Sequence, residues 1–380
     1  MRTNRTNTNI IVNLDTIKTN LSKIKSFIPY QVIAVLKANA YGLGINNILP
    51  AIVDQVYKVA INNAEEYFEY KLYSYPRIFM LLFPELNQQI IENITKYSNI
   101  EISINSREML SLVKKIKHKI KAQLEVDSGI NRTGIKYTDK IYLPDNVQLT
   151  GIYTHLKSDN IQEIMEQLTC FYEFILKNNI DLKNKDIGFL NSSGVMNYHQ
   201  LMKIEDDRVK YLLQISNNVR IGILMYGVAP SYKYVPIKHQ MGIHQSIHME
   251  VSFLGTKMVT RNESIGYTNI NNFVANKDYK VGLAFVGYSR IPYCQNLLFD
   301  VITNKRRVLC KSLGTMSMDI VAFDVNFLEE DEYISKIYLF SEVLEIEFLA
   351  MLNNYTPHLF LTSLGSSRKI YEEVSNYTEV

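Results

Sequence analysis

The chain has 380 residues, of which 47% are hydrophobic, and a formal net charge of +3. This length allows two domains, because single hydrophobic cores rarely grow past roughly 250–300 residues. The small net charge and the lack of a concentrated basic tract argue against a dedicated nucleic-acid-binding protein. The longest basic cluster, at residues 114–121, has Val113, Ile116 and Ile120 at helical spacing, which predicts a solvated helix face.

The number of cysteines and the composition of the N-terminus indicate the cellular compartment in which the protein is found. The three cysteines, Cys170, Cys294 and Cys310, have no metal-ligand spacing, and their odd number is typical of a reducing cytoplasm. The first nine residues are polar and lack the apolar core of a signal peptide. No segment approaches the roughly 18 apolar residues that a membrane helix needs. We therefore expect a cytoplasmic protein without a membrane partner.

The first part of the chain alternates short apolar runs with amphipathic stretches. Predicted strands cover residues 31–36, 77–83, 99–104, 122–126, 147–154, 187–190 and 219–225. Predicted helices cover residues 62–73, a stretch from residue 105 onward, and residues 161–176. In the second of these helices, Asn105 can cap the N-terminus while Glu108 reaches back to the exposed amide.

Strands that alternate with helices in this way indicate parallel βαβ units. Seven or eight such units would close a (β/α)8 barrel, in which the chemistry lies at the C-terminal ends of the strands. A doubly wound open sheet remains an alternative, although no glycine-rich dinucleotide fingerprint follows an early strand.

The pattern changes after about Ser231. Short β-rich runs then cover residues 247–254, 279–286, 297–302, 308–313 and 320–325, with one helical pattern at residues 342–352. We expect a (β/α)8 TIM barrel over residues 10–233, followed by a mostly β domain over residues 234–380. The boundary is expected near residues 231–236, and the N-terminal strand at residues 9–14 is expected to pair with the β domain.

The most informative motif surrounds Lys37. An apolar run, residues 32–36, ends at this lysine, and small residues, a tyrosine and two glycines follow it. A lysine at the C-terminal end of a buried strand can lose its proton when desolvated and then attack carbonyl carbons. Taken alone, however, a lysine in this position is more often a solvated residue that simply ends a strand. His155 and Asn191 also fall at the C-terminal ends of predicted strands, which favours a site at that end of the barrel.

The string Lys37-Ala38-Asn39-Ala40-Tyr41-Gly42, with Val35 before it and Gly44 after it, resembles the lysine motif of the alanine racemase family. These are barrel enzymes that use pyridoxal phosphate. The resemblance implies that Lys37 binds the cofactor covalently and that Tyr41 helps to hold its phosphate. Related barrel decarboxylases share a lysine followed by Ala-Asn, but usually not the continuation at residues 40–44.

Further blocks of the sequence resemble the same family in the same order. Residues 126–134 match a segment whose arginine, Arg132, approaches the cofactor's phenolic oxygen and the substrate carboxylate. An arginine suits this role because its planar fork pairs with carboxylate oxygens. Residues 151–155 match a strand ending in the histidine, His155, that lies along the pyridine ring. Asn191-Ser192 matches a pair in which the serine hydroxyl donates to the phosphate.

Residues 218–223 match the segment with the arginine, Arg220, that lies beside the pyridine nitrogen. Because an arginine keeps its proton, the ring nitrogen would stay unprotonated and the cofactor would be a weaker electron sink. This favours racemisation over transamination. The resemblance also implies that Gly222 and Ile223 offer backbone amides to the phosphate.

In the second domain, residues 265–267 match the block that contains a second acid–base residue, Tyr267. Residues 314–319, with Met318, match a block that reaches a neighbouring active site, and in the family both blocks act across a homodimer interface. Racemisation needs one base on each face of the substrate α-carbon. The resemblance implies that Lys37 serves the face of the D-isomer and Tyr267 of the partner subunit that of the L-isomer. Because the unperturbed pKa of tyrosine is near ~10, it needs help to act as a base. The resemblance implies that His155, linked to Arg220, supplies this help.

The chain departs from the family pattern at three places. Glu125 stands where many members have a lysine that becomes carbamylated, which predicts that Glu125 or a bound anion neutralises Arg132. Ser289 changes the turn after Tyr288, which could still line the substrate entrance. Gly365 stands where a phosphate-contacting tyrosine is expected and would leave room for a larger substrate side chain.

The resemblance implies a pyridoxal-phosphate-dependent alanine racemase that forms a homodimer and supplies D-alanine for peptidoglycan. The closest alternative is a racemase of the same fold that acts on larger amino acids such as serine, lysine or arginine. A barrel-type decarboxylase fits less well, because the Tyr267 block and Arg220 match two-base racemisation. A catalytically inert homologue that binds the cofactor is a further alternative.

Overall fold

The computed structural model describes residues 8–267 and 273–373. The chain divides into two compact units. The first, here called the barrel unit, comprises residues 21–40 and 45–222, and the second, the β unit, comprises residues 1–20, 41–44 and 223–380. The domain boundary expected near residues 231–236 stays a prediction.

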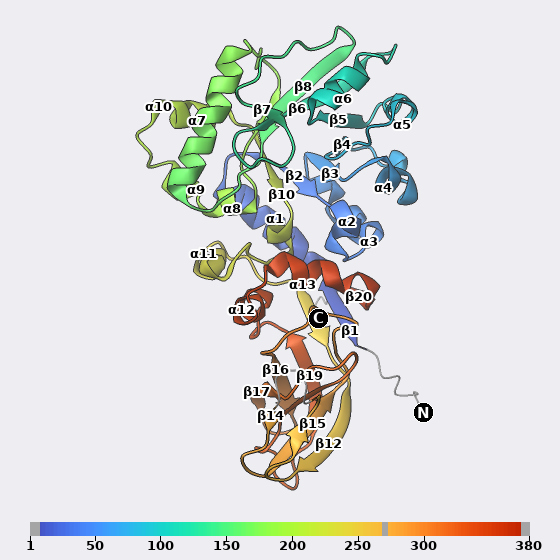
Figure 1. The fold of residues 1–380 in the computed structure, drawn as a ribbon, viewed down its shortest axis with the longest axis vertical. Coiled ribbons are helices and arrows are strands. Elements are labelled where there is room, and N and C mark those ends of the chain that lie inside the picture. Colours follow the sequence, from blue (N-terminus) through green and yellow to red (C-terminus); the bar gives the residue numbers. More distant parts are fainter. Residues whose placement is uncertain (1–7, 268–272, 374–380) are drawn as a thin grey trace, which may run out of the picture. The chain divides into compact units, whose positions relative to one another are not determined.

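The barrel unit is a near-closed ring of eight parallel strands (Figure 1). The strands are β2 (Gln31–Val35), β3 (Lys58–Ile61), β4 (Phe79–Leu81), β5 (Ile100–Ile104), β6 (Ile120–Asp127), β8 (Val147–Thr154), β9 (Asp186–Gly188) and β10 (Asn218–Ile221). They pair in chain order from β2 to β9, and β10 pairs with β2. Two backbone bonds close the ring between β9 and β10, from Asn217 N to Ile187 O (3.1 Å) and from Arg220 N to Leu190 O (3.0 Å). The predicted barrel is confirmed, and the open-sheet alternative is wrong.

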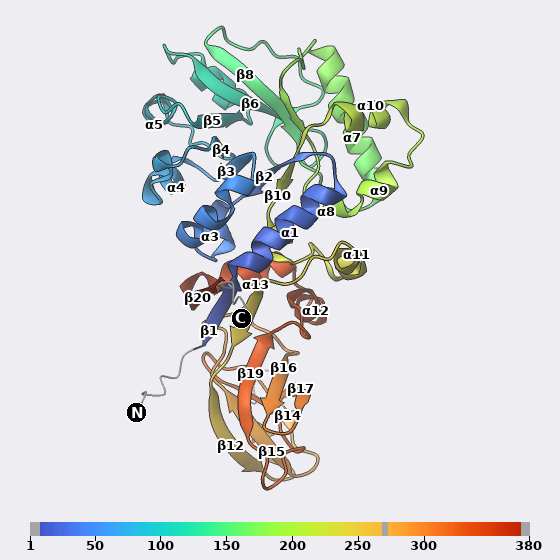
Figure 2. The same cartoon turned by 180° about the vertical axis from the view of Figure 1, so that it is seen from behind.

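Helices connect the strands of the barrel unit (Figure 2). From residue 14 to residue 222 they are α1 (Leu14–Phe27), α3 (Ile45–Ile52), α4 (Ala64–Glu69), α5 (Gln88–Ile94), α6 (Arg107–Val113), α7 (Ile161–Lys177), α8 (Ser192–Met196), α9 (Tyr198–Leu201) and α10 (Asp207–Ile215). Helix α7 begins where predicted because Asn160 Oδ1 accepts hydrogen bonds from Gln162 N and Glu163 N. It buries Ile164, Leu168 and other residues at helical spacing.

Several predicted boundaries in this unit are wrong. Ser106, not Asn105, caps α6, because Ser106 Oγ accepts a hydrogen bond from Met109 N. The Asn105 side chain donates instead to Leu82 O. The basic cluster at residues 114–121 is not a helix face: α6 ends at Val113, and the chain turns into β6.

Two further elements are shorter than predicted. Helix α4 covers only Ala64–Glu69 of the expected 62–73 and is followed by a 3-10 turn, η2 (Leu72–Ser74). Strand β10 ends at Ile221, and a buried 3-10 turn, η3 (Ile223–Tyr226), replaces the rest of the predicted strand.

A buried polar cluster fills the barrel near the starts of its strands. Lys58 Nζ lies 2.7 Å from Glu101 Oε1 and 2.6 Å from Asp186 Oδ2. Gln123 Nε2 donates to both carboxylates. These contacts satisfy the charges that the barrel interior takes out of water. They lie at the end of the barrel opposite to the residues predicted to carry the chemistry.

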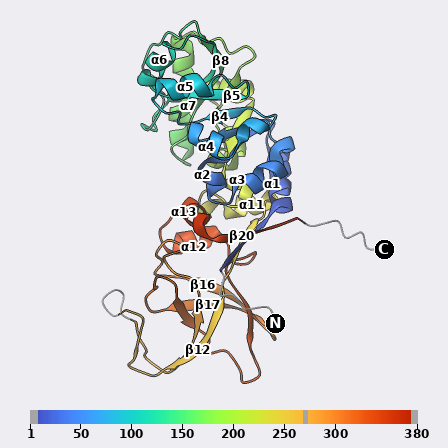
Figure 3. The ribbon, with the colours of Figure 1, turned by 90° about the vertical axis from the view of Figure 1, so that its right-hand side faces the viewer.

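The β unit contains one sheet of nine strands in the order β12-β15-β18-β17-β16-β19-β11-β1-β20. Figure 3 labels β12, β16, β17 and β20 of this sheet. Its strands are β1 (Asn9–Asn13), β11 (Ile247–Glu250), β12 (Phe253–Val259), β15 (Tyr279–Ala284), β16 (Leu298–Thr303), β17 (Arg307–Leu313), β18 (Val321–Asp324), β19 (Ile334–Phe340) and β20 (Arg368–Glu372). A small hairpin joins β13 (Ser264–Ile265) to β14 (Phe273–Val274). The predicted mostly β second domain is confirmed, and so is the pairing of the N-terminal strand, because β1 pairs with β11 and β20.

The β unit also contains elements that the sequence pattern did not predict. Strand β19 lies between β16 and β11, and strand β20 forms an edge. The helices of this unit are α11 (Val235–Gln240), α12 (Ile346–Leu352) and α13 (Pro357–Ser363). Helix α12 starts at Ile346 rather than at the expected residue 342, and α13 was not predicted. Within residues 8–267 and 273–373, no helix is both long enough and apolar enough to cross a membrane.

Candidate active site

Lys37 follows β2 by two residues and opens a left-handed turn. The turn α2 (Lys37–Tyr41) contains four non-glycine residues, Ala38 to Tyr41, whose φ angles lie between 54° and 59°. A left-handed conformation costs roughly 1–2 kcal/mol for each such residue. Ala40 N donates to Leu36 O (2.7 Å), and Asn39 Oδ1 accepts from Ile45 N (2.8 Å). The backbone thus enters the left-handed conformation directly after the lysine. Strained backbone of this kind is often found at functional sites.

The Lys37 amine shares an aromatic platform with an arginine. Its Nζ lies 5.3 Å from the centroid of the Phe83 ring, and Arg132 Cζ lies 5.9 Å from the same centroid. Burial and the positive charge of Arg132 lower the pKa of Lys37, against the opposing effects of Glu66 and Glu125. An amine with a lowered pKa gives up its proton more readily and can serve as nucleophile and base.

Glu125 lies on β6 beneath the loop that carries Arg132. Its side chain is 3% exposed, and Oε1 accepts a hydrogen bond from Thr133 Oγ1 at 2.9 Å. The other oxygen, Oε2, is buried and has no hydrogen-bond partner among the described residues. Burial raises the pKa of Glu125, although Thr133, Arg220 and Arg132 act in the opposite direction. In residues 8–267 and 273–373 no salt bridge joins Glu125 to Arg132, so the predicted neutralisation of Arg132 stays a prediction.

Arg220 lies on β10 with its side chain inside the barrel, and the residue is 5% exposed. Its Cζ lies 4.4 Å from the centroid of the Tyr153 ring. Its Nη2 donates to Thr154 O (2.5 Å) and its Nη1 to Gly188 O (3.4 Å). Burial lowers the pKa of Arg220, but a guanidinium remains protonated in proteins. The ends of β8, β9 and β10 therefore hold a fixed positive charge.

The remaining predicted residues of the barrel unit also follow its strands. His155 comes directly after β8, and its carbonyl accepts from Gln167 Nε2 of α7 (3.2 Å). Asn191 caps α8, since its Oδ1 accepts from Gly194 N at 3.0 Å. Ser192 is the buried first residue of α8, and Gly222 follows β10. The structure thus places these residues at the C-terminal ends of the barrel strands, together with Lys37 and Arg220.

Tyr41 and Gly365 lie in the β unit. The Tyr41 ring packs edge-on against Tyr226, with 5.8 Å between the ring centroids, and burial raises the pKa of Tyr41 to about 12. A Cβ added at Gly42 would lie 3.1 Å from Gly365 N, and the φ of Gly42 is 79°. The two glycines therefore approach closely. A Cβ at Gly365 would meet only Gly42 Cα, at 3.9 Å, so this position leaves space for a side chain. Ile223 opens the 3-10 turn η3 in the same unit.

Three distant segments of the β unit bring Tyr267, Tyr288 and Met318 together. Thr315 Oγ1 donates to Tyr267 O (3.0 Å), and Tyr288 N donates to Ser317 O (3.2 Å). Tyr267 is 60% exposed, Met318 54% and Tyr288 46%. Large exposed side chains on neighbouring segments are typical of a surface that another protein covers.

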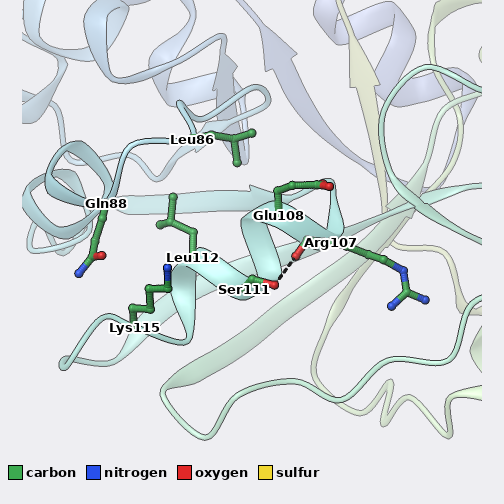
Figure 4. A pocket seen from close by; sticks show the side chains of 7 residues that line it. All are labelled: Leu86, Gln88, Arg107, Glu108, Ser111, Leu112 and Lys115. Carbon is green, nitrogen blue, oxygen red and sulfur yellow. Dashed lines mark hydrogen bonds between the residues drawn. The ribbon is translucent and has the colours of Figure 1, made fainter.

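A surface hollow of about 500 Å³ lies at α5 and α6 (Figure 4). Its lining residues are Leu86, Gln88, Arg107, Glu108, Ser111, Leu112 and Lys115, and none of them belongs to the predicted site. The cationic ends of Arg107 and Lys115 point in different directions, and Arg107 Nε pairs with Asp139 at 3.0 Å. This hollow therefore does not gather groups for chemistry.

Sequence reasoning missed three residues around Lys37 and Arg220: Glu66, Phe83 and Tyr153. A signal was available for Glu66, because Asn63 and Glu66 have capping-box spacing. No comparable pattern marks Phe83 or Tyr153, whose importance comes from the side chains that pack on their rings.

Comparisons with known proteins show the family to which the chain is similar. The family model "Alanine racemase, N-terminal domain" matches residues 12–230. The alanine racemase of Borreliella burgdorferi (strain ZS7) is 28% identical over 97% of this chain and 98% of its own length. An amino-acid racemase of Enterococcus faecalis is 27% identical over 82% of this chain and 44% of its own length.

The fold matches solved structures as well. The alanine racemases of Acinetobacter baumannii and Pseudomonas aeruginosa each superpose with a TM-score of 0.79, covering 97% of this chain and 100% of theirs, at 16% and 19% identity. The family model covers more than half of the chain, so the chain belongs to the alanine racemase family and is an enzyme of that family.

Proposed function

We propose that the chain is a pyridoxal-phosphate-dependent racemase that interconverts L-alanine and D-alanine as a homodimer, by a two-base mechanism, and supplies D-alanine for peptidoglycan. One observation carries the proposal: an amine with a lowered pKa, Lys37, and a buried guanidinium, Arg220, both lie near the C-terminal ends of barrel strands. Family membership supports the same class of reaction. The three free cysteines are compatible with a cytoplasmic enzyme.

The donor groups of this chain fit pyridoxal phosphate. An amine that loses its proton readily suits the cofactor's aldehyde. The hydroxyls of Ser192 and Tyr41 and the backbone amides of Gly222 and Ile223 are groups that bind phosphate. When bound, the cofactor supplies an electron-withdrawing ring that acidifies the α-proton of the amino acid.

Further side chains would position the ring. His155 and Asn191, next to the ends of β8 and β9, would line its place. Arg220 would hold its proton beside the ring nitrogen, because burial does not deprotonate a guanidinium. The unprotonated ring nitrogen would favour proton exchange at the α-carbon, that is racemisation, over transamination.

Two bases would exchange the α-proton. The neutral amine of Lys37 takes up or returns the proton on one face, and Tyr267 of the partner subunit does so on the other. The 60% exposure of Tyr267 in the single chain supports a role that a second subunit completes. In this proposal His155 is linked to Arg220 and helps the tyrosine to act as a base.

Arg132, Met318 and Tyr288 would bind the substrate. The Arg132 guanidinium makes no salt bridge within the described ranges and contacts the Phe83 ring instead, so it is available to a carboxylate. The side chains of Met318 and Tyr288 are exposed, and Tyr288 N donates to the carbonyl of Ser317, the residue before Met318. Both side chains would border the entrance of the site.

A racemase for larger amino acids is the second candidate, because the space at Gly365 could admit a larger side chain. Interconversion rates for alanine, serine, lysine and arginine, measured with the purified chain and added pyridoxal phosphate, separate the two. We expect kcat/KM for alanine to exceed the others by at least about tenfold, which pocket discrimination of this kind can supply. Equal or faster turnover of a larger amino acid would overturn the alanine assignment. Release of carbon dioxide would indicate a decarboxylase, and cofactor binding without isomerisation would indicate an inert homologue.

A further inference from the structure

We infer that Glu66 is a positioning residue for Lys37, because its carboxylate ties the backbone that follows Lys37 to the end of the next barrel strand. The inference rests on the proposed role of Lys37 and adds a residue that acts through the lysine rather than on the substrate.

The contacts of Glu66 join two strand ends. Its Oε1 accepts a hydrogen bond from Ala38 N at 2.6 Å, and its Oε2 accepts one from Asn62 N at 2.7 Å. Ala38 is the first left-handed residue after Lys37, and Asn62 directly follows β3. Hydrogen bonds from backbone amides to a carboxylate are stronger than those between neutral groups. One side chain therefore fixes both backbones.

The helix that carries Glu66 does not need this carboxylate. Asn63 caps α4, and its Oδ1 accepts from Glu66 N at 3.2 Å. In a capping box the glutamate side chain would return to the amide of the cap residue. Glu66 instead reaches the amides of Asn62 and Ala38, which belong to different strand ends. Its contacts therefore serve the arrangement of the barrel strands around Lys37.

Asn62, one of the residues that Glu66 binds, also contacts Phe83, whose ring lies next to the Lys37 amine. Asn62 O accepts a hydrogen bond from Phe83 N at 2.7 Å, and the Phe83 ring lies below Lys37 Nζ. A closed path thus runs from the Lys37 backbone through Glu66 and Asn62 to the ring that the Lys37 amine contacts. The path fixes where the amine lies relative to the ends of β2, β3 and β4.

The charge of Glu66 acts on the same amine. The charged groups that face Lys37 are Arg132, Glu66 and Glu125, and burial together with Arg132 lowers the pKa of Lys37. The two glutamates oppose this effect. Glu125 is buried with a raised pKa, which weakens its charge at a given pH. Removal of the Glu66 charge is therefore expected to lower the pKa of Lys37 further.

Two substitutions separate the charge from the reach of the side chain. Glu66→Gln keeps the length but removes the charge, and Glu66→Asp keeps the charge but shortens the reach. Glu65→Gln, at an exposed glutamate on the same helix, is the matched control. Circular dichroism checks that each variant folds.

The first readout is the pKa of the Lys37 amine in the cofactor-free full chain. It is measured by trace acetylation with acetic anhydride across a pH series, with mass spectrometry of the Lys37 peptide. We expect Glu66→Gln to lower this pKa by about half a unit or more, since a nearby charge at intermediate dielectric has an effect of this size. Glu66→Asp and Glu65→Gln are expected to leave it near the wild-type value.

The second readout is the rate of racemisation. We expect both Glu66 variants to lower kcat at least about tenfold with KM within about threefold, because misplacement of a reacting group slows the chemical step. An unchanged or higher Lys37 pKa in Glu66→Gln, or a wild-type kcat in Glu66→Asp, would overturn the inference. If the wild-type chain racemised no amino acid, the proposed function would fail, and the labelling result alone would still decide the role of Glu66.

Discussion

The guanidinium carbon of Arg220 lies 4.4 Å from the centroid of the Tyr153 ring, and both side chains are buried inside the barrel. The Tyr153 hydroxyl is bonded to Ser103 Oγ at 2.8 Å, which fixes the ring. A buried cation needs compensation, and the ring face, Thr154 O and Gly188 O supply it here. This pairing explains how a positive charge is kept at a defined place in the barrel.

Tyr153 substitutions test this relationship. Tyr153→Leu removes the ring face and leaves a cavity beside Arg220, so we expect a loss of about 2–4 kcal/mol in the free energy of unfolding. Tyr153→Phe keeps the face but loses the hydrogen bond to Ser103 and the interaction of the hydroxyl with Glu125, so a loss of about 1–2 kcal/mol is expected. Urea unfolding at neutral pH measures both. Equal losses in the two variants would show that the ring face does not stabilise Arg220.

Glu125→Gln is expected to change how stability depends on pH. Because burial raises the pKa of Glu125 in the folded chain, the folded state holds this proton more tightly than the unfolded state. The wild type therefore loses stability as the pH rises through the folded-state pKa, whereas the amide does not ionise. A glutamine oxygen can still accept the hydrogen bond from Thr133.

We therefore expect the Tm of Glu125→Gln, relative to wild type, to increase as the pH is raised from acid to neutral. Thermal melts across a pH series check this, with Glu108→Gln at an exposed glutamate as the control. A Tm difference that is constant with pH, or that falls as the pH rises, would contradict the raised pKa.

The left-handed turn predicts opposite effects for two alanine substitutions. Ala38 is exposed and has a φ of 54°, so Ala38→Gly removes a conformational penalty of about 1–2 kcal/mol and adds about 0.5–1 kcal/mol of entropy loss. A net gain of about 0.5–1 kcal/mol in stability is expected. Ala51→Gly, in the right-handed helix α3, should instead cost about 0.5–1 kcal/mol. The same sign of effect in both variants, by chemical denaturation, would argue against the turn.

The barrel could be predicted from the sequence because the apolar runs that form its strands end at polar or charged residues. The runs before Lys37 and His155 became β2 and β8, and the predicted site residues of the barrel fell at strand ends. Boundaries were harder. Asn105 and Ser106 are both good caps, so composition could not separate them. The run at residues 219–225 stays apolar through η3 because that turn is buried too, and burial alone does not distinguish a strand from a 3-10 turn.

The site was predictable only in part. The left-handed turn after Lys37 could not be expected, because alanine and tyrosine disfavour that conformation and one of the bonds that hold it comes from the distant Glu66. Glu66 shows the same limit: its spacing from Asn63 predicts a local cap, but its carboxylate accepts a hydrogen bond from Ala38 N in the turn after the neighbouring strand β2. The roles proposed for Arg132 and Tyr267 depend on a ligand and a second subunit, which one sequence does not encode as a pattern.

Lys37 of one subunit and Tyr267 of the partner subunit are proposed to form a single site, and mixed dimers test this proposal. Lys37→Ala and Tyr267→Phe chains with different affinity tags are co-expressed, and dimers carrying both tags are isolated. Each homodimer should lose at least about 100-fold in racemase activity, because one of its two bases is missing. The mixed dimer retains one intact site, so about half of the wild-type activity per dimer is expected. Mixed dimers no more active than the two homodimers would contradict a site shared between subunits.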